Sequence, residues 1–499
     1  MIPACYLVFD AGTQSVKTAV YTREMECIAQ YSAPTHLTCP QPGWVEMDPD
    51  EYVRLAKEGM AACSAQLKER RVPLSAVRAI MGDGIICGVT GIDAEGKAVT
   101  PYINYLDSRT AKEADAMDVP ASWGEKTGNT KASCMFPALI AGWLRRNHAE
   151  FQKRGVAFVH NAPYILMKLA GAAGTDAWID WGTLSGWGFG YDLRTKEWDR
   201  DALAALGLDS LVMPRIAAPY EVMGRLSKEA AQQTGFPEGI PICAGAGDTM
   251  QSLLGCGCAE AGTAVDVAGT CAMLCAATKG VVPGLSASGS LIFNSGTLPD
   301  TYFYWGFVRA GGLSLRWFKD NICEGGESEY RRLSERAACL SPGADGVWFI
   351  PYLTGGYGEY EHLKASFLNL QLDTDRYTLW RAVLEAIAYE YRDCAELYRE
   401  HGQAIEELII TEGGSRDALW NQIKADVLHC RTAVPPAAAG ALLANAWTAA
   451  YAVGDITDLK EMALAHQEGR TVWQPDNARR RRYDELYEAR LALRKTLCI

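Results

Sequence analysis

Three kinds of short segment in the 499-residue sequence carry residue types that can handle phosphate and protons. The first begins at Asp10 and ends at Lys17, with Gly12, Thr13 and Ser15 between them. A glycine lets the backbone approach a ligand closely, and successive turn amides can point at an anion. The hydroxyls and the ammonium group add donors, while the Asp10 carboxylate can bind Mg²⁺ directly or through water. This segment therefore predicts a phosphate-binding turn, with an ordinary hairpin as the alternative.

The second kind is an apolar run, residues 241–247, that leads into Asp248 and a helical pattern of Met250, Leu253 and Leu254. A carboxylate at a helix start commonly caps the helix. The functional interpretation is a general base that takes a proton from a substrate, set against a wall kept open by small residues. The segment by itself leaves both interpretations open.

The third kind is a pair of glycines after a β-rich run. Gly413 and Gly414 precede Ser415, and together they can form a flat backbone surface on which an adenine ring lies. The alternative is a plain β-to-α turn in which Ser415 or Asp417 caps the next helix. A similar pair, residues 311–312, follows the β-rich run 302–308.

The elements that must position these residues repeat along the chain. Residues 6–22 and 263–277 each have the pattern of strand, turn and strand, and both turns contain Ala-Gly-Thr. Elsewhere β-rich and helical patterns alternate, which predicts helices packed on a mixed or mostly parallel sheet. Strands are expected at 76–81, 89–93 and 408–411, and helices at 111–117, 137–146, 377–397 and 437–453. We therefore predict an α/β fold of two related halves that meet near residues 245–262.

Composition limits the classes of function. Lys and Arg number 48 and Asp and Glu 60, a net charge of −12, and 48% of the residues are hydrophobic. This composition excludes disorder as the main state, and without a long basic face it argues against a nucleic-acid partner. The four arginines at 479–482 precede an acidic helical pattern, so we expect a solvated helix start there.

The sequence also indicates a compartment. No apolar stretch approaches the roughly 18 residues that a membrane span needs, and the N-terminus does not have the pattern of a signal peptide. The 16 cysteines are scattered without a Cys-x-x-Cys pair, so no zinc site is predicted. We expect a cytoplasmic protein without a membrane partner, whose thiols are reduced and mostly buried.

Taken together, these motifs resemble those of the FGGY family of carbohydrate kinases, which shares the actin-like ATPase fold. The resemblance covers almost the whole chain, because the motifs follow one another in the family's order. They are Asp10-x-Gly-Thr-x-Ser-x-Lys17, Pro42-Gly-Trp-Val-Glu-Met-Asp-Pro49, Asp107-x-Arg109, Asp192-Leu-Arg-Thr-Lys-Glu-Trp198, Ala244-Gly-Ala-Gly-Asp248, Gly269-Thr270, Arg381-Ala-Val-Leu-Glu385 and Gly413-Gly-Ser415.

The resemblance implies two actin-like, ribonuclease H-like domains that flank a deep cleft. A sugar-binding domain is expected at residues 1–250, an ATP-binding domain at 251–455, and a helical tail that packs on the domains at 456–499. The implied substrate is a small sugar or polyol, and the implied cofactors are ATP and Mg²⁺. A homodimer is left open.

The resemblance also implies roles for individual residues. Asp248 corresponds to the catalytic base, and Asp10 and Asp248 are expected to hold Mg²⁺. The residues expected to contact the sugar are Asp83, Asp107, Arg109 and Asp248. The residues expected to contact the nucleotide are Gly12, Thr13, Gln14, Ser15, Lys17, Gly269, Thr270, Gly311, Gly312, Gly413, Gly414 and Ser415.

The sequence departs from the family's pattern at the sugar site. Xylulokinase-like members have a polar Gln-Met-His run there, whereas this chain has Ile85, Ile86 and Cys87. A site that pairs with hydroxyls loses strongly on such a change, so xylulose recognition does not follow, and Asp83 is a candidate substitute contact. Four nearby aromatic residues either stack on a sugar or, as we favour, pack in the core: Trp178, Trp181, Trp187 and Phe189.

Four functions are therefore considered. The leading one is an ATP-dependent kinase of a ketose such as xylulose or of a polyol. A kinase of an unusual or signalling sugar is the alternative among enzymes. A catalytically weak sugar-sensing protein would keep the fold but have no task for a positioned base such as Asp248. An actin-like or chaperone-type ATPase would not need the Pro-Gly-Trp and Gly-Asp segments.

Overall fold

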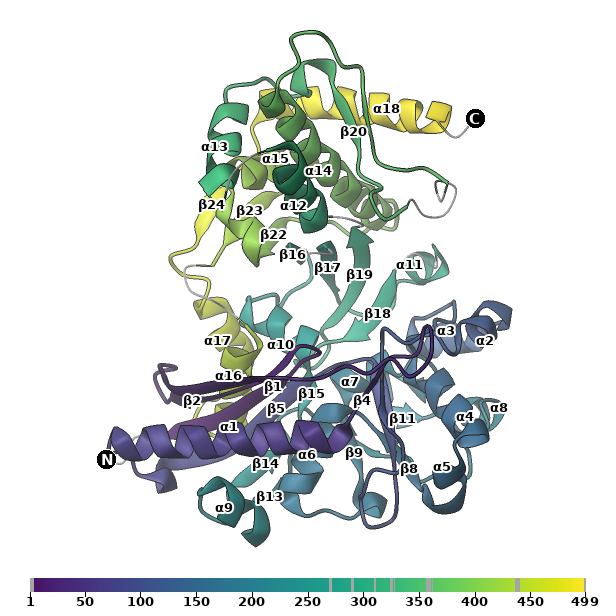
Figure 1. The fold of residues 1–499 in the computed structure, drawn as a ribbon, viewed down its shortest axis with the longest axis vertical. Coiled ribbons are helices and arrows are strands. Elements are labelled where there is room, and N and C mark those ends of the chain that lie inside the picture. The colour runs from purple at the N-terminus through teal and green to yellow at the C-terminus, as the bar shows by residue number, and fades with distance from the viewer. Residues whose placement is uncertain are drawn as a thin grey trace. The chain divides into compact units, whose positions relative to one another are not determined.

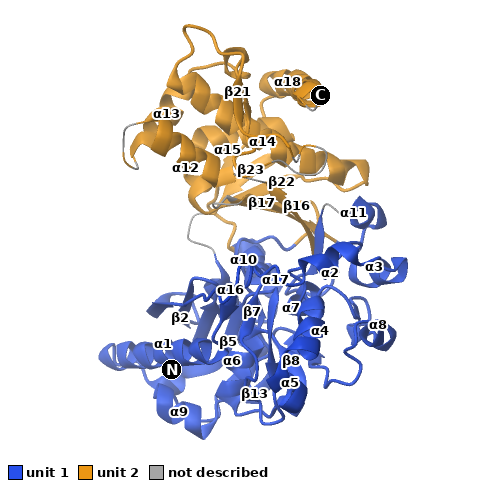
Figure 2. Cartoon of the chain, turned by 45° about the vertical axis from the view of Figure 1, so that its right-hand side comes forward, with its two compact units in different colours: residues 1–259, 279–302, 439–465 blue, residues 260–278, 303–438, 466–499 orange. Residues whose placement is uncertain are grey.

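The computed structural model describes residues 4–268, 272–288, 291–308, 311–323, 326, 328–355, 360, 362–435 and 440–497. The chain forms two compact units, coloured separately in Figure 2. The first contains residues 1–259, 279–302 and 439–465, and the second contains residues 260–278, 303–438 and 466–499. Each unit is thus assembled from segments that are distant in the sequence. The domain division at residues 250 and 455, with a separate tail, stays a prediction.

The main sheet of the first unit grows from the predicted strand–turn–strand segment. β1 (Cys5–Ala11) pairs antiparallel with β2 (Ser15–Thr22) and parallel with β5 (Val77–Gly84). The strand order is β13-β14-β5-β1-β2-β3, and β15 also pairs with β5. The other strands are β3 (Cys27–Pro34), β13 (Val222–Arg225), β14 (Pro241–Cys243) and β15 (Ala246–Gly247). The predicted hairpin at 6–22 and strand at 76–81 are confirmed.

Smaller elements complete this unit. A four-stranded sheet of order β4-β7-β6-β8 contains β4 (Glu46–Met47), β6 (Gly88–Ile92), β7 (Tyr102–Asn104) and β8 (Ala157–Val159). The short strands are β9 (Trp178–Asp180), β10 (Tyr191–Asp192), β11 (Glu197–Trp198), β12 (Arg215–Ala217) and β18 (Ile292–Ser295). The helices are α1 (Pro49–Glu69), α2 (Ala111–Ala116), α3 (Ala121–Thr127), α4 (Pro137–Asn147), α5 (Ala149–Arg154), α6 (Asn161–Ala170), α7 (Trp181–Gly186), α8 (Arg200–Ala205), α9 (Lys228–Thr234), α10 (Asp248–Gly255), α11 (Pro283–Ser288), α16 (Ala441–Ala452) and α17 (Leu459–Ala465). The helices predicted at 111–117 and 137–146 are confirmed as α2 and α4.

Alternation along β1 separates the core of this unit into two layers. Leu7 and Phe9 pack with α1 and α6, whereas Tyr6 and Val8 pack with α16 on the other face. The predicted alanine-rich helix is therefore present, and it covers a sheet that begins more than 400 residues earlier. Figure 1 shows α16 in yellow-green beside the purple strands. The Asn445 amide of α16 donates a 3.0 Å hydrogen bond to the carbonyl of Phe9.

The second unit repeats the strand pattern of the first. β16 (Thr263–Ala268) pairs antiparallel with β17 (Ala272–Thr278) and parallel with β22 (Glu407–Thr411), as β1 does with β2 and β5. The strands follow the order β19-β17-β16-β22-β23-β24. The predicted repeat and the α/β class are thus confirmed, although the turn at residues 269–271 lies outside the described residues.

The remaining elements of the second unit are strands and helices in equal number. Its other strands are β19 (Tyr302–Val308), β20 (Trp348–Ile350), β21 (Ser366–Leu368), β23 (Arg431–Val434) and β24 (Thr471–Trp473). Its helices are α12 (Gly311–Ile322), α13 (Ser328–Ala337), α14 (Arg376–Glu400), α15 (Ala418–Leu428) and α18 (Asn477–Leu497). The predicted helix at 377–397 is α14, and the arginines at 479–482 lie in the first turns of α18, largely exposed as expected.

An ion pair is completely buried in the second unit. Lys424 of α15 and Asp266 of β16 have 0% exposed side chains, and their charged atoms, Nζ and Oδ2, lie 2.5 Å apart. The Tyr391 hydroxyl of α14 donates to the other oxygen of Asp266. The ammonium group also lies 3.4 Å from the centre of the Trp420 ring. One sheet strand and two helices are thus joined by a polar cluster inside an apolar core.

The structure also tests the expected burial of aromatic and cysteine side chains. The four aromatic residues at 178–189 are at most 8% exposed, so they pack in the core. The indoles of Trp178 and Trp181 donate to the carbonyls of Ala244 and Gly296, both at 2.9 Å. The cysteines in the described part of the chain are all free thiols, and eight of them are buried. Within that part, no helix is both long and apolar enough to cross a membrane.

Candidate active site

Three aspartates converge at one edge of the first sheet. Asp10 lies opposite Asp83 in the parallel pairing of β1 with β5. β15 pairs with the end of β5 and leads directly into Asp248, the first residue of α10. Parallel strands end at the same edge of a sheet, which is where ligands bind in such folds. The sheet therefore brings together Asp10 and Asp248, the predicted metal ligands, of which Asp248 is also the predicted base, and Asp83, a predicted sugar contact.

Asp248 is held by the residue that follows it. The backbone N–H and the hydroxyl of Thr249 donate to Oδ1 at 2.5 and 3.2 Å. The helix cap is Gly247, so the carboxylate is not the N-cap that the alternative interpretation required. Burial and the negative charge of Asp10 raise the pKa of Asp248 to about 7, although hydrogen bonds from Thr249 and the charge of Lys17 lower it. Asp248 is thus a half-buried carboxyl group that gains and loses its proton near neutral pH.

Asp83 is the most buried of the three. Its side chain is 0% exposed, and neither carboxylate oxygen has a hydrogen-bond partner within 3.5 Å among the described residues. Burial raises the pKa of Asp83 well above its usual range, the charges of Asp10 and Asp248 raise it further, and the Asn445 amide lowers it. Burial and the two neighbouring carboxylates therefore both disfavour the charged form of Asp83. Its contact with a sugar stays a prediction.

The predicted phosphate-binding turn connects β1 to β2. The Gly12 N–H donates to the carbonyl of Ser15 at 3.0 Å, and the Thr35 hydroxyl donates to the carbonyl of Thr13 at 2.6 Å. Gln14 is exposed, while Gly12, Thr13 and Ser15 are half-buried. Lys17 Nζ lies 3.2 Å from Asp10 Oδ2. Donors for an anion and a carboxylate for a cation are therefore adjacent.

The predicted sugar contacts Asp107 and Arg109 form a buried clamp. The Arg109 guanidinium donates to both oxygens of Asp107 at 2.9 Å and to Glu46 at 2.7 Å. It also stacks over Trp44, 3.9 Å from the ring centre. The backbone N–H of Val45 donates to Asp107 at 2.6 Å. These groups join the segment at 44–46 to the one at 107–109, and their contact with a sugar stays a prediction.

The remaining predicted nucleotide contacts belong to the second unit. Gly311 and Gly312 open α12, and an added Cβ at Gly311 would lie 2.4 Å from the Cβ of Ala272. Gly413, Gly414 and Ser415 form a 3-10 turn after β22, with open space beside Gly413. Gly269 and Thr270 lie outside the described residues. Gly311 thus has no room for a side chain, whereas Gly413 faces open space, and the contacts with a nucleotide themselves stay predictions.

Glu412 precedes this turn in a backbone conformation that is nearly restricted to glycine. Its φ is 59° and its ψ is −159°. A residue with a Cβ in this region is strained by about 1–3 kcal/mol, and such strain is concentrated at functional sites. The Glu412 carbonyl accepts the Ser415 hydroxyl at 2.7 Å, which ties the strained residue to the predicted adenine-binding turn.

Replacing Glu412 with Gly is expected to stabilise the protein by about 1 kcal/mol, because the relief of strain exceeds the extra flexibility of glycine in the unfolded chain. Thermal unfolding would measure the gain. Glu412→Ala is the matched control, since alanine also lacks the carboxylate but keeps the strained Cβ. Equal melting temperatures for the two variants would contradict the role of strain.

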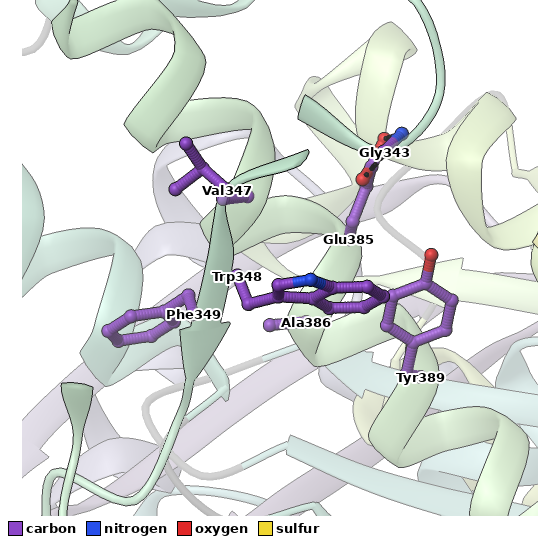
Figure 3. A pocket seen from close by; sticks show the side chains of 8 residues that line it. Gly343, Val347, Trp348, Phe349, Glu385, Ala386 and Tyr389 are labelled. Carbon is purple, nitrogen blue, oxygen red and sulfur yellow. Dashed lines mark hydrogen bonds between the residues drawn. The ribbon is translucent and has the colours of Figure 1, made fainter. Parts of the chain in front are cut away.

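A small cavity in the second unit is not a substrate site. It is lined by Trp348, Tyr389 and Glu385 among others, and its volume of about 10 Å³ holds about one water molecule (Figure 3). Glu385 is already satisfied by Arg381 at 2.8 Å and by the hydroxyl of Tyr483 at 2.9 Å. The motif at residues 381–385 therefore forms a buried ion pair within α14.

Sequence reasoning missed two polar groups near the three aspartates. Asn445 hydrogen-bonds to β1 and lowers the pKa of Asp83, and it is the one amide side chain in the alanine-rich helix α16. The Tyr102 hydroxyl is fully buried and has no hydrogen-bond partner within the described ranges. Its ring packs edge-on against Tyr52, whose hydroxyl donates to the carbonyl of Gly12 at 3.2 Å. An amide within an alanine-rich helix was the available signal for Asn445, whereas no local pattern marks the Tyr102 hydroxyl.

Comparisons with known proteins identify relatives along nearly the whole chain. The model of the FGGY family of carbohydrate kinases matches with its N-terminal domain at residues 5–255 and its C-terminal domain at residues 265–453. A xylulose kinase of Bacillus subtilis is 22% identical over 493 residues, which cover 96% of this chain and 94% of that protein. An autoinducer-2 kinase of Salmonella typhimurium is 26% identical, with 91% and 87% covered. The crystal structure of xylulose kinase from Rhodospirillum rubrum superposes with a TM-score of 0.87 at 26% identity, covering 99% of each chain.

Proposed function

Because the chain belongs to the FGGY family of carbohydrate kinases, we propose that it transfers the terminal phosphoryl group of ATP to a hydroxyl of a small ketose or polyol. The two-domain α/β fold and the enzyme class, a carbohydrate phosphotransferase, follow from family membership. The observation that carries the finer proposal is the convergence of Asp10, Asp83 and Asp248 beside the turn that begins at Gly12.

Asp248 is the proposed general base. Thr249 occupies Oδ1, and no hydrogen bond from the described residues reaches Oδ2, which is left to accept a proton from the substrate hydroxyl. The hydroxyl oxygen then forms the new bond to phosphorus as the bond between phosphorus and the bridging oxygen of ADP breaks. The proton stays on Asp248 until solvent removes it. A base with a pKa near 7 is suited to this task at neutral pH.

The residues at the site fit a magnesium ion. Mg²⁺ keeps several waters and is commonly bound by one or two carboxylates together with substrate phosphates. Asp10, 15% exposed, and the half-buried Asp248 provide two such carboxylates. Among the described residues there is no cluster of three or more His, Cys, Asp and Glu that would form a complete protein cage. When bound, Mg²⁺ spreads the negative charge that develops during phosphoryl transfer.

The other proposed contacts are those with the nucleotide. They rest on hydrogen-bond donors in the turn between β1 and β2 and on the glycine-containing backbone of the second unit. Thr13, Ser15 and Lys17 would bind the phosphates together with the amides of the turn, and alignment by these groups would supply much of the rate. The glycine pairs of the second unit and Ser415 would bind the nucleotide.

Two acceptor classes are supported by different observations. The relatives named xylulose kinase support a ketose. A relative named autoinducer-2 kinase supports a signalling sugar, and the apolar Ile85 and Ile86 favour this second candidate over xylulose itself. A sensor that has lost turnover would bind the same ligands without releasing ADP.

The test is the release of ADP from ATP and Mg²⁺ with a panel of pentuloses, hexuloses, tetritols, pentitols and glycerol. One acceptor that raises turnover far above background ATP hydrolysis, with the acceptor phosphate detected by mass spectrometry, is the expected result. ATP binding without turnover on every acceptor would contradict the kinase proposal and favour the sensor.

The proposed base makes the reaction sensitive to acid. Because Asp248 must be unprotonated and its pKa is raised to about 7, kcat/KM is expected to fall as the pH decreases below about 7. Lys17 lowers this pKa, so Lys17→Met should shift the midpoint to higher pH as well as reduce the rate. Initial rates between pH 5.5 and 9 at fixed ATP would measure both midpoints. A profile with no acid limb in this range would contradict the assignment of Asp248.

A further inference from the structure

The backbone carbonyls of the turn between β1 and β2 are held by donors from other segments of the first unit. The carbonyl of Gly12 accepts a hydrogen bond from the Tyr52 hydroxyl at 3.2 Å, and that of Thr13 accepts one from the Thr35 hydroxyl at 2.6 Å. The carbonyl of Gln14 accepts the backbone N–H of Thr35 at 3.1 Å. Three consecutive carbonyl oxygens of this turn are therefore occupied.

The same hydrogen bonds orient two backbone N–H groups. A trans peptide group is planar, and its C=O and N–H bonds point in opposite directions. A Gly12 carbonyl that faces Tyr52 thus directs the N–H of Thr13 away from Tyr52. A Thr13 carbonyl that faces Thr35 likewise directs the N–H of Gln14 away from Thr35.

These two N–H groups are available to a ligand. Within the described ranges neither of them donates to an acceptor of the protein. Gln14 is exposed and Thr13 is half-buried, so both N–H groups belong to residues that solvent reaches. Successive backbone N–H groups of a turn that point the same way form a concave site for an anion. The turn therefore has a donor side, and protein groups hold its acceptor side.

Packing alone does not fix the peptide that joins Gly12 to Thr13. Glycine has wide conformational freedom, and a Cβ added to Gly12 would lie no closer than 3.6 Å to its neighbours. The orientation of this peptide depends on the Tyr52 hydroxyl, whose side chain is 1% exposed within α1. The hydroxyl also lies 2.9 Å from the sulfur of Met47, but a thioether is only a weak acceptor, so the carbonyl is the stronger one.

We infer that Tyr52 and Thr35 are positioning residues for the phosphates of the nucleotide. They act through the turn, because their hydroxyls keep the N–H groups of Thr13 and Gln14 directed at the anion. A peptide that rotated without them would place a carbonyl oxygen beside the phosphate and repel it. This inference rests on the proposed kinase function and adds two residues that prepare its phosphate site.

The experiment measures the affinities of the protein for ATP and for adenosine by isothermal titration calorimetry, without an acceptor. Tyr52→Phe and Thr35→Val each remove one hydroxyl and keep the approximate shape of the side chain. Each variant is expected to raise the Kd for ATP about tenfold, the effect of losing one hydrogen bond to a charged group. The Kd for adenosine should change by less than about twofold, because adenosine has no phosphate for the turn to bind.

Two further variants separate positioning from general damage. Thr35→Ser keeps the hydroxyl and should bind ATP almost as well as the wild type, although it lacks the methyl group that Thr35→Val retains. Tyr191→Phe is the matched control for Tyr52→Phe. The Tyr191 side chain is 0% exposed, and its hydroxyl donates at 2.8 Å to the carbonyl of Ser185, outside the turn. Its loss should leave the affinity for ATP unchanged.

Three results would overturn the inference. The first is an unchanged affinity for ATP in both Tyr52→Phe and Thr35→Val. The second is an equal loss of affinity for ATP and adenosine, which would indicate a general disturbance of the protein. The third is a Thr35→Ser variant that binds ATP as weakly as Thr35→Val, because the hydroxyl would then have no role.

Failure of the kinase proposal gives a different result, since binding is measured without turnover. A wild-type protein that binds ATP but releases no ADP with any acceptor would contradict the kinase proposal. A selective loss of ATP affinity in Tyr52→Phe and Thr35→Val would still support the positioning role in such a protein. A wild-type protein that binds neither ATP nor inorganic triphosphate would overturn the inference, because the two N–H groups would have no anion to bind.

Discussion

Replacing Asp248 with Asn is expected to lower kcat by about 10²- to 10⁴-fold, the usual contribution of a positioned general base. Asparagine keeps the size of the side chain but cannot accept the proton of a hydroxyl. Thr249 still holds the neighbouring backbone, so the start of α10 should keep its geometry. Single-turnover phosphorylation of the acceptor, measured with ATP and Mg²⁺ in excess, isolates the chemical step from binding and product release.

The loss of activity in Asp248→Asn must be distinguished from unfolding of the variant. The raised pKa of Asp248 predicts how the variant's stability should differ from that of the wild type at each pH. A carboxyl whose pKa is raised in the folded protein stabilises the fold below its unfolded pKa, and this contribution is lost as the pH rises through the folded value, about 7. Asp248→Asn should therefore melt at a higher temperature than the wild type at pH 8, with a smaller difference at pH 4. Reduced stability at pH 8 would contradict this account.

Asp201→Asn is the matched control for the charge. Asp201 lies in the first turn of α8 in the same unit and is exposed. It loses the same negative charge near a helix start, outside the cluster of Asp10, Asp83 and Asp248. Its kcat is expected to stay within about twofold of the wild type. Comparable losses in the two variants would show that helix-terminal charge, rather than a base, explains the effect.

The second large effect is on stability. Lys424→Met is expected to destabilise the second unit by about 3–5 kcal/mol, because it leaves Asp266 buried without its counter-ion. The melting temperature of that unit should decrease by roughly 10 °C. Differential scanning calorimetry would measure the change. Lys364→Met, at an exposed lysine of the same unit, is the control and should have little effect.

A double variant tests whether the lost partner is the cause. Lys424→Met combined with Asp266→Leu replaces both charges with apolar groups, and buried pairs replaced in this way are commonly neutral or more stable. The double variant should therefore recover most of the stability that the single variant loses. If the two losses simply add, the charges act independently, and packing around Lys424, including its contact with Trp420, accounts for most of the lost stability.

Local patterns predicted the elements well because they are short-range signals. The hairpin that contains Gly12 and the helix α14 follow from the spacing of apolar residues within windows of about 20 positions. The repeat was visible for the same reason, since both copies place their turn between two β-rich runs. The position of Asp248 at a helix start also followed from its neighbours, although the cap proved to be Gly247.

Long-range pairings were not predictable from such windows. The Arg109 guanidinium, which binds Asp107, also donates to Glu46, about 60 residues away. The sequence around Asp107 and Arg109 does not show that these protein groups already occupy the hydrogen-bonding atoms of the pair. The ion pair of Asp266 with Lys424 joins positions more than 150 residues apart. The strain at Glu412 depends on the path of the backbone after β22, which no residue type specifies. Each of these depends on which strands and helices become neighbours.

The position of α16 also determines the order in which the chain can fold during synthesis. Tyr6 and Val8 emerge from the ribosome first, whereas the helix that covers them, residues 441–452, is among the last elements made. For most of the synthesis one face of the first sheet therefore has no native cover, and its apolar side chains must be kept from other chains. The first unit cannot close before residues 303–438, the largest segment of the second unit, have been made.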